Sequence, residues 1–316
     1  MFTLKHYVLE IAKSGSFSQA AENLYVSQPS LSASILRLEK RIGEPLFDRS
    51  VHPVRLTETG EEYVHTAYAL AELEKNFQVY LEEHQKSQTG RLILGGSHLN
   101  LSYVIPPLLR QYRKEYPLVE ISLVDGNIDR LYAMLSDGDI DLVVDSGSVD
   151  HALFEEYLYQ PEILLLAVPD HFPCNEVMKA YQIGYDEVLQ NIHADPGIPA
   201  PPLSLLGDTP FLNMTPDTDT GKREKRIFRR ENFRPNSPFA FRQQLTAFHL
   251  ACQGIGCTII SDMLVKSGIF RPKLTFYKLD ETESFRYIKF YQKKGRRMTF
   301  AMRSFLICAG AIGDKG

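Results

Sequence analysis

Apolar side chains recur every three or four residues between Leu4 and Ala12, which predicts an amphipathic helix that ends at Gly15. Ser16 and Gln19 then have the Ser-x-x-Gln form of a capping box, in which each side chain satisfies a backbone N–H at the start of a helix. The opening of the chain therefore predicts two short helices in succession, the first of which supports the second.

The next helix has two contrasting faces. Ser27 is placed to cap it, and Pro29 is tolerated in its first turn because an N–H there has no acceptor within the helix. Steps of four, three and four residues predict a buried apolar stripe made of Leu31, Ile35, Leu38 and Ile42. The other face carries Pro29, Ser32, Ala33, Leu36, Arg37 and Lys40. Such a pair of helices is typical of a helix-turn-helix, although a generic helical hairpin with a solvated face has the same pattern.

A long helix is predicted from Thr59 to about residue 88, with Thr59 and Glu62 as its capping box. Alternating steps of three and four define a stripe of Tyr63, Thr66, Leu70, Leu73, Phe77, Tyr80 and His84. This spacing predicts packing against a partner helix, with dimerisation through Tyr63, Leu70, Leu73, Phe77 and Tyr80. A helix that lies on its own domain is the alternative.

After a polar linker at 85–90, the pattern changes to alternating strands and helices. Strands are predicted at 91–95, 119–125, 140–145, 163–168, 210–214, 257–261, 274–279 and 287–292. Helices are predicted at 100–116, with a bend near Pro106, at 128–136, at 241–253 and from Met298 onward. The alternation indicates an α/β domain built from parallel β-α-β units.

Composition changes this picture little. The chain has 316 residues, 44% hydrophobic and 23% charged, as an ordinary soluble protein has. Its net charge is -4, and the first 60 residues carry seven basic side chains against six acidic ones, a net of +1. DNA recognition must therefore rest on geometry, because bulk electrostatics alone would not suffice. With neither a secretory signal nor ~18 apolar residues in a row, we expect a cytoplasmic protein with no membrane contact.

The sequence offers little support for catalysis. Four cysteines, Cys174, Cys252, Cys257 and Cys308, lack the paired spacing of metal ligands and are expected to be buried apolar residues. Glycine-rich phosphate loops and nucleophile elbows are also missing, and the Ser97-His98 pair has no visible orienting acid. We therefore predict no catalytic residue, no cofactor and no metal. The alternatives are an enzyme or a small-molecule-binding protein with an incidental helical N-terminal domain.

A resemblance raises the weight of the DNA-binding interpretation. The segments GSFSQAA at 15–21, VSQPSLS at 26–32, PLFDR at 45–49 and RLTETG at 55–60 resemble, in order and spacing, the winged helix-turn-helix of LysR-type transcriptional regulators. The resemblance implies a DNA-binding domain at 1–60, a linker and dimerisation helix at 61–89 and an effector-binding domain at 90–316. It also implies promoter DNA, a second copy of the chain in a homodimer or homotetramer, and RNA polymerase as partners.

The same resemblance implies the DNA contacts. The first helix of the motif would be 16–24, the recognition helix 28–43 and the wing 49–55. Candidate DNA-binding residues are Ser16, Ser18, Ser27, Gln28, Pro29, Ser30, Ser32, Ala33, Leu36, Arg37, Arg49, His52 and Arg55. Ala33 and Leu36 depart from the side chains that the family often has there, basic or amide at the first position and polar at the second. This departure shifts the expected readout toward Gln28, Pro29, Ser32, Arg37 and the wing.

The C-terminal region resembles the two-lobed, periplasmic-binding-protein-like effector domain of the family, on landmarks such as Gly126-Asn127 and Gly254-Ile255-Gly256. Lobe 1 is expected at about 90–160 and 270–316, and lobe 2 at about 161–269, with crossings near 160–161 and 268–273. Ligands settle at strand C-terminal ends in such sheets. Candidate effector-binding residues are Ser97, His98, Asn100, Asn127, Thr215 and Phe241, for an organic acid or another small anion.

Some of these residues also have structural interpretations. An exposed loop histidine without a role is an equally good interpretation of His98, and core packing is the favoured interpretation of Phe241. A basic run, Lys222, Arg223, Lys225, Arg226, Arg229, Arg230 and Arg234, suits the solvated face of a helix better than a second nucleic-acid site.

Overall fold

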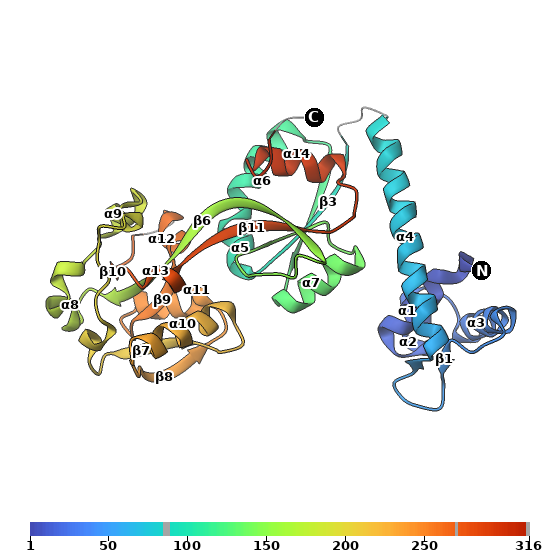
Figure 1. Cartoon of the computed structure of the whole chain (residues 1–316), viewed down its shortest axis with the longest axis horizontal. Coiled ribbons are helices and arrows are strands. Elements are labelled where there is room, and N and C mark those ends of the chain that lie inside the picture. Colours follow the sequence, from blue (N-terminus) through green and yellow to red (C-terminus); the bar gives the residue numbers. More distant parts are fainter. Residues whose placement is uncertain (85–88, 269–270, 314–316) are drawn as a thin grey trace. The chain divides into compact units, whose positions relative to one another are not determined.

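The computed structural model describes residues 1–84, 89–268 and 271–313 (Figure 1). It divides into two compact units, Met1–Lys86 and Ser87–Gly316. Among the described residues, no helix is both long and apolar enough to cross a membrane.

The first unit packs its helices around one apolar core. Its elements are η1 (Phe2–Leu4), α1 (Lys5–Ser14), α2 (Phe17–Asn23), α3 (Gln28–Ile42), β1 (Phe47–Asp48), β2 (Arg55–Leu56) and α4 (Glu58–His84). β1 and β2 form an antiparallel ribbon that follows α3. The core joins the predicted stripe of α3 to residues of α1, α2 and the start of α4, so the helical part of the sequence pattern is confirmed.

The predicted caps form at Ser16 and Ser27 and not at Thr59. The Gln19 half of the predicted capping box does not form, because its side chain donates to Glu22 and Asn23. Ser16 Oγ accepts from the Gln19 N–H at 3.4 Å, and Ser27 Oγ accepts from the Ser30 N–H at 3.4 Å. The prediction that Thr59 caps α4 is wrong, because Thr57 Oγ1 accepts from the Gly60 N–H at 3.0 Å. Helix α4 consequently begins one residue before Thr59, at Glu58.

Helix α4 serves its own domain first. Tyr63 is 6% exposed, and its ring stacks on Phe2 with 4.7 Å between centroids. The prediction that Tyr63 belongs to a dimer seam is therefore wrong, since its ring is already covered. Leu70 is half-buried, whereas Leu73 and Phe77 are 64% and 61% exposed. The side chain of Tyr80 lies outside the described part of the chain.

The first lobe of the second unit is an α/β layer. Strands β3 (Gly90–Gly96), β4 (Val119–Asp125) and β5 (Leu142–Asp145) run parallel, as predicted, with β3 in the middle. Helices α5 (His98–Tyr103), α6 (Ile105–Glu115), α7 (Ile128–Asp137) and α14 (Phe300–Cys308) cover the sheet, and an apolar cluster lies on each side of it. The predicted helix 100–116 is interrupted at Val104, two residues before the expected bend.

Two long antiparallel strands connect the lobes. β6 (Phe154–Pro169) and β11 (Phe285–Lys293) pair over the whole of β11, and Figure 1 shows both passing from one lobe to the other. β11 also pairs with β5 of the first lobe. The predicted crossing near 160–161 lies inside the single strand β6.

The second lobe repeats the plan. Its strands are the end of β6 with β7 (Pro210–Met214), β8 (Asn236–Phe241), β9 (Thr258–Ser261) and β10 (Leu274–Tyr277). Its longer helices are α10 (Asp219–Arg230) and α11 (Gln244–Cys252). The remaining helices are α8 (Cys174–Val177), η2 (Lys179–Tyr181), α9 (Tyr185–Leu189), η3 (Ile192–Ala194), η4 (Leu203–Leu206), α12 (Asp262–Lys266) and α13 (Glu281–Ser284).

Two predictions about this lobe are wrong. Strand β10 pairs with β6 inside the second lobe, so the return crossing is β11 and not the segment 268–273, and the lobe 1 boundary at 270 is too early. Residues 241–243 precede α11, and Phe241 ends strand β8, which the sequence analysis missed. The predicted parallel β-α-β units do not extend to β6, β9, β10 and β11, which pair antiparallel.

Candidate DNA-binding surface and effector site

The outer face of α3 is free of cover within its own unit. Leu31, Ile35 and Leu38 are no more than 2% exposed. The other side of the helix is open to solvent at Gln28, Pro29, Ser30, Ala33, Leu36 and Arg37, whereas Ser32 is half-buried. The structure therefore brings most of the predicted recognition residues together on one exposed ridge, slim enough for a major groove.

The turn before α3 adds a residue that the sequence analysis did not single out. Tyr25 has a φ of 55°, in the left-handed region, and its side chain is 96% exposed. A tight turn between two helices needs such a conformation, and here it directs an aromatic side chain outward beside Ser27. Its position in the turn is the only sequence signal that could have indicated it.

The wing is joined to α3 through Glu39, which is 8% exposed. Its Oε1 accepts from the N–H groups of Leu46 at 2.9 Å and Phe47 at 3.3 Å. Its Oε2 pairs with Arg49 at 2.9 Å, and the Arg49 guanidinium lies 4.8 Å from the centre of the Phe17 ring. Arg49 therefore supports the recognition helix in addition to any DNA contact.

The remaining DNA candidates lie at the edges of this surface. His52 and Arg55 are exposed in and after the wing loop, and Ser18 is exposed on α2. Ser16 is half-buried and occupied in capping.

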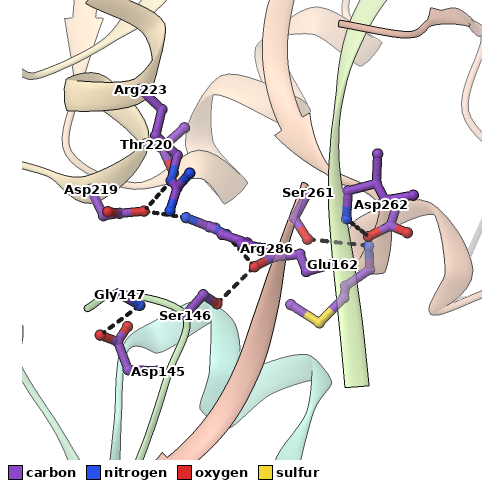
Figure 2. A network of polar contacts seen from close by, with 12 residues as sticks. Asp145, Ser146, Gly147, Glu162, Asp219, Thr220, Arg223, Ser261, Asp262 and Arg286 are labelled. Atoms are coloured by element: carbon purple, nitrogen blue, oxygen red, sulfur yellow. Dashed lines mark hydrogen bonds and ion pairs between the residues drawn. The ribbon is translucent and has the colours of Figure 1, made fainter. Parts of the chain in front are cut away.

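At the junction of the lobes, Arg286 lies within a network of carboxylates (Figure 2). Its side chain is 8% exposed and forms an ion pair with Glu162, whose side chain is fully buried. Arg286 also pairs with Asp219 at the first turn of α10, and Ser146 donates to Glu162 Oε2 at 2.7 Å. The second lobe thus contacts this guanidinium through Asp219, and the first lobe is connected to it through Ser146 and Glu162.

The carboxylates of this network differ in their electrostatics. Burial opposes the ionisation of Asp219, but Arg286 and Arg223 outweigh it and hold the pKa of Asp219 below its ordinary value. Burial raises the pKa of Asp145, which accepts from Tyr132 Oη and the Gly147 N–H at 3.1 Å each. The charge of Arg286 acts on both carboxyl groups, because it lowers the pKa of Asp219 and opposes the rise in the pKa of Asp145.

The predicted effector residues fall into two groups. In the first lobe, Ser97 caps α5 and Asn127 caps α7, while His98 Nδ1 lies 3.7 Å from Asp125 Oδ2, an acid that was not apparent in the sequence. In the second lobe, Thr215 and Phe241 are half-buried neighbours at the ends of β7 and β8, where the Thr215 N–H donates to the Phe241 carbonyl at 2.8 Å.

Asn100 needs a correction. Its side chain is 4% exposed, and Nδ2 donates to the Val144 carbonyl at 3.1 Å. This amide fixes α5 to β5, so the expectation that it is a free donor for a ligand is wrong.

Sequence reasoning missed Arg286, Glu162 and Asp219 because 124 residues separate the first two and 67 separate the first and third. A usable signal was present: Glu162 stands directly before the apolar run 163–169 of β6, and a charge buried in a strand requires a partner.

A helix-turn-helix with a wing, in a chain that also carries a two-lobed α/β domain, defines a DNA-binding regulator with a small-molecule domain. Residues 3–61 match the bacterial regulatory helix-turn-helix protein, lysR family, and residues 85–311 match the LysR substrate binding domain. The second match covers more than half of the chain, which therefore belongs to the LysR family of transcriptional regulators.

Individual relatives agree with this assignment. The uncharacterized HTH-type transcriptional regulator YcgK of Bacillus subtilis (strain 168) is 27% identical over 304 residues, covering 95% of this chain and 91% of that protein. A probable RuBisCO transcriptional regulator of Cyanidioschyzon merolae is 34% identical over 165 residues, 51% of this chain and 54% of that protein. Both relatives are named as transcriptional regulators.

Solved structures share the fold. A full-length OxyR variant from Pseudomonas aeruginosa has a TM-score of 0.68 at 21% identity, covering 98% of this chain and 94% of that one. Full-length CbnR complexed with its target DNA has a TM-score of 0.57 at 18% identity, with 98% and 99% covered. The predicted fold class, a winged helix-turn-helix with a two-lobed α/β effector domain, is confirmed.

Proposed function

We propose that this regulator reads a two-fold operator with the ridge of α3 and the wing. The observation that carries the proposal is the uncovered outer face of α3, held against the wing by Glu39. Gln28 and Arg37 are the candidates for base edges, because amides suit adenine and guanidinium groups suit guanine. Arg49, His52 and Arg55 are the candidates for the DNA backbone or the minor groove.

The test measures operator binding of the Gln28→Ala, Arg37→Ala double variant by fluorescence anisotropy. We expect the affinity for the operator to fall by at least about tenfold, since each base contact contributes roughly 1–3 kcal/mol, while binding to unrelated DNA changes less. The exposed Arg91→Ala variant removes one charge outside the first unit and should bind as the wild type does. An unchanged preference of the double variant for the operator would exclude α3 as the reading element.

For the effector, we propose that a small carboxylate binds at the junction of the lobes by replacing Asp219 at Arg286. Asp219 supplies an internal carboxylate to this guanidinium, and its side chain remains 41% exposed while that of Glu162 is buried. An incoming acid would therefore exchange with Asp219 more easily than with Glu162, and the hydroxyl of Ser97 and the amide of Asn127 would serve as further donors.

A thermal-shift screen of small organic acids tests this mechanism, because a ligand in excess raises the melting temperature. An acid that stabilises the wild type should bind the Asp219→Asn variant several-fold more tightly, since the competing charge is gone. The Asp129→Asn variant, a matched change on α7, should bind the acid with the affinity of the wild type. Ser97→Ala and Asn127→Ala should bind it more weakly. If no acid stabilises the wild type, or Asp219→Asn binds it no better, the exchange mechanism is wrong.

The proposal also covers the oligomeric state of the protein and its action on RNA polymerase. Two chains would join through the exposed side of α4, including Leu73 and Phe77, and so present two α3 helices to the half-sites of an operator. We place this regulator in the cytoplasm, as a homodimer or homotetramer that acts on RNA polymerase in response to the effector.

A further inference from the structure

The basic run on α10 divides into two faces with different surroundings. Three arginines are ion-paired on one side: Arg223 with Asp219 at 3.0 Å, Arg226 with Glu283 at 2.7 Å and Arg230 with Asp280 at 2.6 Å. On this side, Arg226 and Arg230 hold α10 against α13, and Arg223 pairs with the first turn of α10 itself. The solvated-face interpretation of the whole run is therefore incomplete.

The other side of α10 borders a groove of about 530 Å³, within the range of roughly 300–1,000 Å³ that is usual for small-molecule sites. Lys225, Arg229 and Arg234 line it, are exposed, and have no ion-pair partner among the described residues. Three cations at one rim give the groove a site for an anion with more than one negative charge.

Two buried oxygens on the lining of the groove have no hydrogen-bond partner among the residues that the structure describes. Glu224 is 2% exposed, and its Oε2 accepts from the Met214 N–H at 2.7 Å, whereas its Oε1 has no partner within the described part of the chain. Asn213 Oδ1 is buried and equally without a partner there. Glu224 Oε2 has a structural role, because it fixes the end of β7. Glu224 Oε1 and Asn213 Oδ1 have no such role. Buried polar atoms without partners are costly, so they point to a hydrogen-bonding ligand.

An aromatic wall completes the groove. Phe228 and Phe233 line it and pack edge to face, with centroids 5.6 Å apart. Phe228 also packs against the fully buried Phe211 at 5.2 Å, which holds its ring in place. A ring-containing ligand would gain apolar and aromatic contact here.

We propose that this groove is a second ligand site, distinct from the junction of the lobes, for a nucleotide-like phosphate ester whose ring carries an amino group. The phosphate would bind Lys225, Arg229 and Arg234, the ring would lie against Phe228 and Phe233, and the amino group would meet Asn213 Oδ1 and Glu224. The proposal does not depend on the effector mechanism, because none of these residues belongs to the Arg286 network.

The protonation of Glu224 agrees with such a ligand. Burial raises the pKa of Glu224 to about 8, although the Met214 N–H opposes this shift. The carboxyl group is therefore mostly protonated at neutral pH, and its Oε1 can donate or accept. An amino group next to a ring nitrogen offers one donor and one acceptor, which complements a carboxylic acid.

The test is calorimetric titration of the full-length protein with adenosine 5′-monophosphate as the probe. Adenosine lacks the phosphate and purine riboside 5′-monophosphate lacks the amino group, and we expect each to bind at least about tenfold more weakly. Arg229→Glu with Arg234→Glu should weaken the nucleotide by about the same factor or more. Lys222→Glu reverses an exposed charge on the same helix outside the groove and should change binding less than about twofold.

A second variant separates ligand contact from folding. Asn213→Leu should weaken adenosine 5′-monophosphate and leave the purine riboside monophosphate unchanged, a difference that a general loss of stability would not produce. Absence of binding to the wild type at millimolar nucleotide would overturn the proposal, as would equal binding by the charge-reversed variant. If the charge reversals instead change the molecular mass in solution, the groove belongs to a self-association face and the ligand site is wrong.

Discussion

At the scale of single residues, two buried glutamates show that hydrogen-bond and ion-pair partners determine the structural role of a buried carboxyl group. Glu39 accepts two backbone N–H groups and pairs with Arg49, so both of its oxygens are occupied. Glu224 accepts one N–H and leaves its other oxygen without a partner in the described chain. A fully satisfied buried carboxylate fixes structure, whereas an incompletely satisfied one tends toward its neutral form.

Glu224 should therefore make the stability of this protein depend on pH. Its folded pKa, about 8, lies above the ordinary value of 4.5. The stabilisation from the protonated form is present below about pH 4.5 and is lost as pH rises through 8, by up to about 1.4 kcal/mol per pH unit. Glu224→Gln keeps an acceptor for the Met214 N–H and lacks this titration. Urea unfolding at pH 5 and pH 8 should show the wild type losing stability relative to the variant, and parallel curves would contradict the assignment.

At the scale of elements, local signals predicted more than distant ones. The caps at Ser16 and Ser27 and the buried stripe of α3 were predicted because each depends on neighbours within a few residues. Strand β8 was missed, because Asn236 and Pro238 interrupt the alternation of apolar residues that would predict a strand. Strand β10 was placed in the wrong lobe, because its partner strand β6 lies more than a hundred residues earlier in the sequence. The heptad stripe of α4 did not separate positions that face its own domain, such as Tyr63, from exposed ones.

Helix α4 gives a prediction at this scale. Leu73→Glu should weaken self-association by at least about tenfold, because it places a charge where we expect an apolar helix contact. Leu153→Glu, at a residue 54% exposed in the second unit, is the matched control. Sedimentation equilibrium measures both variants. A mass distribution of Leu73→Glu equal to that of the wild type would remove α4 from the dimer interface.

At the scale of the whole molecule, the sequence predicts the fold of the effector domain but not the residues that meet at the junction of its lobes. Alternating elements and a few glycine landmarks indicated two α/β lobes, and the family comparison confirmed them. The Arg286 network could not be placed, because it forms only where a crossing strand, α10 and the end of β5 meet in space. Residues that cap helices locally, such as Ser97 and Asn127, were easier to find than residues that join the lobes.

The crossing strands limit how the two lobes can move. β6 and β11 remain hydrogen-bonded across the junction, and their register shifts between Ile288 and Lys289. A bulge of this kind bends and twists a ribbon without separating its strands. We therefore expect the lobes to twist about this ribbon more easily than they separate, because separation would break the hydrogen bonds between β6 and β11. An acid bound at Arg286, as proposed, would then change the twist of this ribbon more than the separation of the lobes.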